Sequence, residues 1–100
     1  MATLRDAAGF QQEIIEALKK ESFDLLLKRP PREKLLPPAN LRGLKIFVCR
    51  KAGENGGVEI SVRVERRSLL IFAVVSEDGF EILSGGKIIP FNDEKYDDAD

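Results

Sequence analysis

The segment from Val58 to Val64 limits the fold of this chain more than any other, because its apolar and polar residues alternate without a break. Successive side chains of a β-strand point to opposite faces of a sheet, so the four apolar residues of this segment share one face. A strand with one apolar and one polar face is typical of an antiparallel sheet that is covered on one side. We therefore expect a small α+β domain.

Residues 3–27 are expected to form the helix that covers the apolar face. Phe10, Ile14 and Leu18 recur at helical spacing and form one apolar stripe. The polar residues between them, Gln11 among them, are expected to face water. Because the valine face of the strand needs a lid, the predicted fold is an N-terminal amphipathic helix packed on a four- to five-stranded antiparallel meander.

The two ends of this helix are marked by polar residues and prolines. Thr3 followed by Asp6 is a helix start signal, although the glycine in the first turns moves the expected firm start to Phe10. Ser22 either continues the helix or caps a second, short helix over residues 23–28. The Pro-Pro pair that follows stops any helix there.

Residues 29–43 are expected to form a connector that packs on the fold. Two Pro-Pro pairs stiffen this segment toward an extended polyproline conformation. It is not a free linker, because Leu35, Leu36 and Leu41 are expected to seek burial.

Residues 44–91 are expected to form the antiparallel meander, because each connection is short enough to join neighbouring strands. The expected strands are 44–50, 58–65, 68–75, 80–83 and 87–91. The loop at 52–57 contains Asn-Gly, a strong hairpin signal. Glu77-Asp78-Gly79 is expected to be another turn.

The length of 100 residues indicates one domain, which we place at residues 1–92. Residues 93–100 carry five acids and are expected to be a disordered tail. The N-terminus lacks the apolar core of a signal peptide. The longest apolar run, residues 69–75, is too short to span a bilayer. A cytoplasmic protein without membrane contact is the expectation.

The side chains favour a protein that is not an enzyme. The chain has no histidine, the commonest acid–base group near neutral pH, so its serines have no histidine to activate them. Its one cysteine, Cys49, lies in an apolar strand and is expected to be a buried, inert thiol. No metal-ligand spacing and no phosphate-binding loop is present, so we expect neither a metal nor a cofactor.

The expected strand 68–75 is apolar on both faces, whereas one helix can cover only one of them. The candidate interface on the second face consists of Phe47, Leu70, Phe72 and Val74. Either the segment Leu35–Leu41 or a second molecule must cover it, and we favour a symmetric homodimer.

The net charge of −1 hides an uneven distribution, because residues 28–51 carry eight basic residues against one acid, a net charge of +7. This candidate surface for an anionic partner comprises Lys28, Arg29, Arg32, Lys34, Arg42, Lys45, Arg50 and Lys51. It lacks interleaved exposed aromatic residues and any nucleic-acid-binding motif. We therefore expect a small binding or accessory protein that acts through protein–protein contact. The alternative is a nucleic-acid-associated protein that uses this basic segment.

Overall fold

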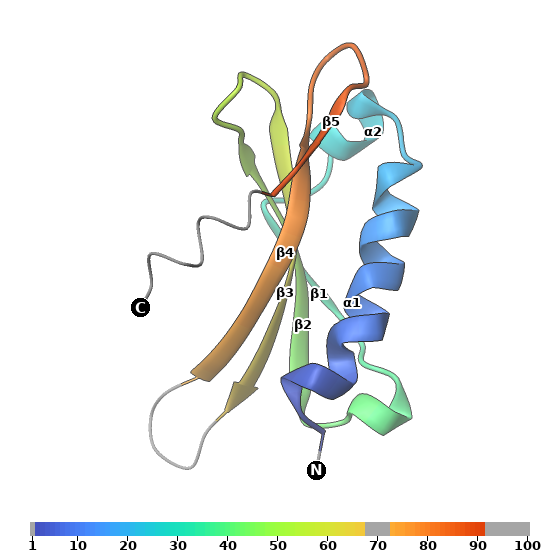
Figure 1. Cartoon of the computed structure of the whole chain (residues 1–100), viewed down its shortest axis with the longest axis vertical. Helices are drawn as coiled ribbons and strands as arrows, with labels where there is room; N and C mark the ends of the chain where they lie inside the picture. The colour runs from blue at the N-terminus through green and yellow to red at the C-terminus, as the bar shows by residue number, and fades with distance from the viewer. Residues whose placement is uncertain (1, 68–72, 92–100) are drawn as a thin grey trace.

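Figure 1 shows the computed structural model of the chain, which describes residues 2–67 and 73–91. The helix α1 (Leu4–Lys19) packs on one face of a five-stranded antiparallel sheet, which confirms the predicted fold class. The strands are β1 (Arg32–Leu35), β2 (Leu44–Ala52), β3 (Val58–Arg67), β4 (Ala73–Ile82) and β5 (Ile88–Pro90). They lie in the sheet in the order in which they occur in the chain, so the sheet is a meander.

Local capping explains where the helices begin. The Thr3 hydroxyl accepts a hydrogen bond from the Asp6 N–H, and the Asp6 carboxylate accepts one from the Thr3 N–H. This capping box fixes the start of α1 at Leu4, which confirms the predicted start signal at Thr3 and Asp6; the predicted later firm start at Phe10 is wrong. Ser22 caps a separate helix, α2 (Phe23–Leu27). Of the two predicted alternatives for Ser22, the cap of a second helix is therefore correct.

The core lies between the two helices and the sheet. The apolar face of β3 is buried there, as its alternation predicted, together with Ile15, Leu18 and Leu26 from the helices. Gln11 is also buried, so the prediction that it faces water is wrong. Its Nε2 donates hydrogen bonds to the carbonyl oxygens of Val62 and Ser76, and these bonds allow an amide to lie in the core.

The proline-rich connector contains a short strand and a 3₁₀ turn, which its composition did not predict. Residues Arg32–Leu35 pair with β2 as the edge strand β1, and a 3₁₀ turn, η1 (Ala39–Leu41), follows. Leu41 is buried and Leu35 packs against the core, as predicted. Leu36 is 92% exposed, so the prediction of its burial is wrong. Its neighbour Leu35 points toward the core, and alternation along an extended chain turns Leu36 away from it.

The strand β4 replaces two predicted strands and the turn between them. Glu77, Asp78 and Gly79 lie in the middle of β4, where they pair with β3, so the predicted turn is wrong. Glycine is needed here for space, because a Cβ at Gly79 would lie 2.0 Å from the carbonyl oxygen of Ile60. The predicted start of this strand, residues 68–72, and the predicted tail, residues 93–100, lie outside the described residues.

Candidate interaction surface on the open face of the sheet

The two faces of the sheet differ in what covers them. Both α1 and α2 lie on the same side, and none of the described segments forms a layer on the other side (Figure 1). We call this other side the open face. Among the residues whose side chains the structure describes, the register of the five strands assigns to it Arg32, Lys34, Lys45, Phe47, Cys49, Lys51, Glu59, Ser61, Arg63, Glu65, Val75, Glu77, Gly79, Glu81 and Ile89.

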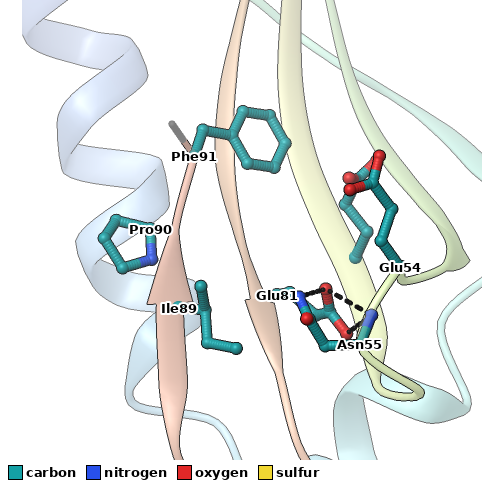
Figure 2. A pocket seen from close by; sticks show the side chains of 7 residues that line it. Glu54, Asn55, Glu81, Ile89, Pro90 and Phe91 are labelled. Carbon is teal, nitrogen blue, oxygen red and sulfur yellow. Dashed lines mark hydrogen bonds between the residues drawn. The ribbon is translucent and has the colours of Figure 1, made fainter. Parts of the chain in front are cut away.

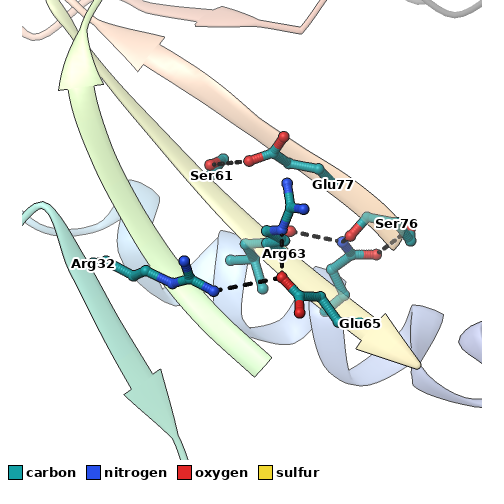
Figure 3. Close-up of polar contacts among 8 residues, drawn as sticks. Arg32, Ser61, Arg63, Glu65, Ser76 and Glu77 are labelled. Atoms are coloured by element: carbon teal, nitrogen blue, oxygen red, sulfur yellow. Dashed lines mark hydrogen bonds and ion pairs between the residues drawn. The ribbon is translucent and has the colours of Figure 1, made fainter. Parts of the chain in front are cut away.

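An aromatic ring and an ion pair hold side chains of the open face in place across three strands. The Arg32 guanidinium lies over the ring of Phe47, with Cζ 4.0 Å from the ring centroid. Phe47 is 9% exposed, so its ring is largely hidden. Figure 3 shows that the Glu65 carboxylate accepts a 2.6 Å hydrogen bond from Arg63 Nε and a 3.5 Å bond from Arg32. Arg32 from β1 is thereby connected to β3 over the top of β2.

A second polar group lies in the centre of the open face, between β3 and β4. The Ser61 hydroxyl donates a 2.9 Å hydrogen bond to the Glu77 carboxylate (Figure 3). Cys49, whose thiol was predicted to be buried, is only half-buried, and it lies directly across from Ser61 in the register. Burial, and then the negative charge of Glu77, raise the pKa of this thiol. At neutral pH Cys49 is therefore held in its neutral form.

The charges of the open face divide along the strands. Its positions on β1 and β2 carry four cations, Arg32, Lys34, Lys45 and Lys51, and no acid. Among the positions on β3 and β4 whose side chains the structure describes, four are acids, Glu59, Glu65, Glu77 and Glu81, and one is a cation, Arg63. The face thus has a basic half and an acidic half, side by side.

The cations stand above the acids. Lys51 Nζ lies 3.0 Å from a Glu59 carboxylate oxygen, and the two side chains are 74% and 12% exposed respectively. At this pair, and at Arg32 above Glu65, a partner that approaches the open face meets the cation first and finds the carboxylate already paired.

The β2–β3 hairpin ends in a loop that is built around Glu81. Figure 2 shows the Glu81 carboxylate, which accepts hydrogen bonds from the side-chain amide and the backbone N–H of Asn55. It also accepts one from the backbone N–H of Gly57. Burial acts to raise the pKa of Glu81, and the hydrogen bonds outweigh it, so that the pKa is lowered. Gly56, with a φ of 82°, makes the turn that the Asn-Gly pair predicted.

A cavity of about 240 Å³ lies beside this loop (Figure 2). Glu54 and Glu59 from the hairpin and Ile89, Pro90 and Phe91 from the β5 segment line it, together with Asn55 and Glu81. The Glu81 carboxylate is used inside the loop, and Glu59 is paired with Lys51. Two carboxylates of this cavity, those of Glu59 and Glu81, therefore serve the fold of the hairpin.

The structure divides the predicted basic surface. Arg32, Lys34, Lys45 and Lys51 gather on the open face. Arg29 instead binds Glu21 at 2.7 Å and Glu33 at 2.9 Å, and the Arg50 guanidinium donates to the backbone carbonyl of Arg29. Lys28 and Arg42 lie at the ends of α2 and η1. Four of the eight residues of the predicted basic surface thus lie together on the open face, and the other four lie elsewhere.

Part of the predicted apolar interface lies beyond the described residues. Phe47 is on the open face, whereas Leu70 and Phe72 lie outside the described residues. For Val74 the structure describes the backbone, which pairs with Arg66, and not the side chain. That interface stays a prediction.

Five charged residues of the open face were not among the predicted site residues: Glu59, Arg63, Glu65, Glu77 and Glu81. The alternation of β3 already placed the first three on its polar face, and this signal could have identified them. Glu77 was not predicted to lie on a strand face, because a turn was predicted at residues 77–79.

The described residues carry two further negative findings. Neither of the described helices is long and apolar enough to cross a membrane. Within residues 2–67 and 73–91, no three acidic or thiol side chains are placed to hold a metal ion together. The chain matches no known family model, no curated protein and no solved structure.

Proposed function

We propose that this chain is a small non-enzymatic binding or accessory protein that acts through protein–protein contact, and that the open face is its contact surface. The observation that carries the proposal is that the described helices cover one side of a five-stranded sheet and leave the other side to ordered side chains. Strands about 4.8 Å apart that rise about 3.3 Å per residue give this face roughly 600 Å². A specific interface buries about 800 Å² per partner, so the face fits a small or transient contact.

The edges of the sheet support the face as the contact surface. Pro90 lies in the edge strand β5 and has no N–H to offer to an added strand. The other edge strand, β1, lies between the two Pro-Pro pairs of the connector, so it cannot be extended easily. Prolines at both edges oppose pairing with a further strand.

The polar groups of the open face do not favour catalysis. Ser61 is bound to Glu77, but it is 4% exposed, so a substrate cannot reach its hydroxyl. Cys49 has a raised pKa, whereas a reactive cysteine needs a lowered one. These arrangements support a binding role rather than an enzyme.

The alternative function, nucleic-acid association, is favoured by one observation. The four cations of the basic half lie on adjacent strands, as a phosphate-binding surface requires. Against it, the only ring among them belongs to Phe47, which Arg32 covers, so no base can stack there.

Site-specific photocrosslinking in cells that express the protein tests the proposal. A benzophenone amino acid replaces Lys45 on the open face, or Ala17 on the exposed side of α1 as the matched control. We expect discrete protein adducts from position 45 and none from position 17. Equal adducts from both positions, or none from position 45, would overturn the proposal.

A binding titration separates the two functions. Labelled single-stranded DNA and RNA of mixed sequence are titrated with the protein at low salt, with Lys34→Glu/Lys45→Glu as the control. We expect no saturable binding. Binding that salt weakens and that the double variant abolishes would replace protein contact with the nucleic-acid alternative.

A further inference from the structure

We infer that the open face binds a second copy of this chain, face to face, about a two-fold axis that runs parallel to the strands. This inference rests on the proposed function and names its partner. The starting observation is the division of the open face into a basic half on β1 and β2 and an acidic half on β3 and β4.

The symmetry of a homodimer decides which halves meet. A two-fold axis along the strands exchanges the two halves, so the basic half of each copy faces the acidic half of the other. An axis across the strands would instead place the basic half on itself, with like charges opposed. The first arrangement satisfies both halves at once, and its strands run in similar directions, as aligned packing of two sheets requires.

The inner side chains of the open face support this arrangement. Apolar atoms of Phe47, Val75 and Ile89 lie among the charges on three different strands. Val75 is among the exposed large hydrophobic residues, at 37%. A dimer would cover it, and the partly buried acids would gain exposed cations from the partner as neighbours. Because the charges at the rim are exposed, the dimer should weaken with salt.

Complementary charge reversal tests both the partner and the axis. One variant, Lys34→Glu/Lys45→Glu, makes the basic half acidic, and a second variant, Glu59→Lys/Glu77→Lys, makes the acidic half basic. Sedimentation equilibrium at low salt measures each variant alone and the equimolar mixture. Glu13→Lys on the exposed side of α1 is the control.

We expect the wild type and the control to dimerise, and each reversed variant alone to dimerise at least about tenfold more weakly. The mixture should recover dimers, because each reversed half then meets a complementary one. Dimerisation of either variant like the wild type, or no recovery in the mixture, would overturn the proposed axis.

A wild type that stays monomeric at about 1 mM would overturn the second copy as partner. In that case adducts of position 45 with a different protein would still support the proposed function, so the two failures are distinguishable. A thermal melt checks that each variant is folded. Where a double variant is unfolded, Lys45→Gln and Glu77→Gln replace the reversals, and each should weaken the dimer.

Discussion

The Gln11 side chain reaches from α1 to the sheet, where its Nε2 donates a 2.8 Å hydrogen bond to the carbonyl oxygen of Val62. The same nitrogen lies 3.3 Å from the carbonyl oxygen of Ser76 on the neighbouring strand. One buried amide therefore holds the helix to two strands, at the back of the sheet whose front is the open face.

Gln11→Ala should destabilise the protein by about 1–2 kcal/mol, because it removes hydrogen bonds within the core. The matched control is Gln12→Ala, whose 2.8 Å bond to Asp78 lies at the surface and should cost less than about 0.5 kcal/mol. Urea denaturation measures both variants. Equal losses of unfolding free energy in the two variants would show that the buried hydrogen bonds of Gln11 stabilise the protein no more than the surface bond of Gln12.

Glu81→Gln should lower the melting temperature at neutral pH, because the hairpin loop is held by the ionised carboxylate. The folded-state pKa of Glu81 is lowered, so this contribution is present above its ordinary pKa of 4.5 and is lost as the pH falls through the folded value. Melts of the wild type and the variant should therefore converge as the pH falls below about 4.5. A gap between the two melting curves that is constant with pH would contradict this assignment.

Gly79→Ala should destabilise the protein by roughly 1–3 kcal/mol, because its Cβ would collide with the backbone of Ile60. Gly85→Ala is the control, since a Cβ at that position meets no atom within 4 Å. Chemical denaturation compares the two. A tolerated Gly79→Ala would place the turn, rather than a strand, back at residues 77–79.

Cys49 should react slowly with thiol reagents in the folded protein, because burial and the charge of Glu77 raise the thiol pKa. Labelling at pH 7 should accelerate on unfolding by denaturant. Glu77→Gln should also accelerate it in the folded state, because the nearby negative charge is gone. Labelling of the native wild type as fast as that of the unfolded chain would overturn the burial of Cys49.

The local periodicity of the sequence predicted much of this fold. The features that it did not predict depend on pairing between strands that are distant in sequence. The alternation of β3 identified its core face correctly, because the pattern depends only on neighbours in sequence. The stripe of α1 did so in part, because Leu18 is buried whereas Phe10 and Ile14 are only partly buried. The edge strand β1 was not predicted, because the prolines on both sides of it indicate a connector. Its conformation is decided by its pairing with β2.

The open face shows the same limit. The sequence placed Arg63 and Glu65 on a polar strand face, but the contact of Arg32 with Phe47 depends on a register that no local pattern encodes. The sequence predicts Gly79 in a turn, whereas it lies in β4, because glycine serves both turns and close contacts between strands. Only the pairing of the strands in the sheet shows which cations lie on the same face.

Amide NMR spectra recorded from about 20 µM to about 1 mM protein test most directly whether the open face binds a second copy of this chain. We predict concentration-dependent shifts for Lys45, Phe47 and Arg63, and none for Glu13 and Ala17 on the exposed side of α1. The shifts should shrink as salt is added, because exposed charges contribute to the contact. Shifts that are confined to α1, or spectra that do not change with concentration, would contradict the account.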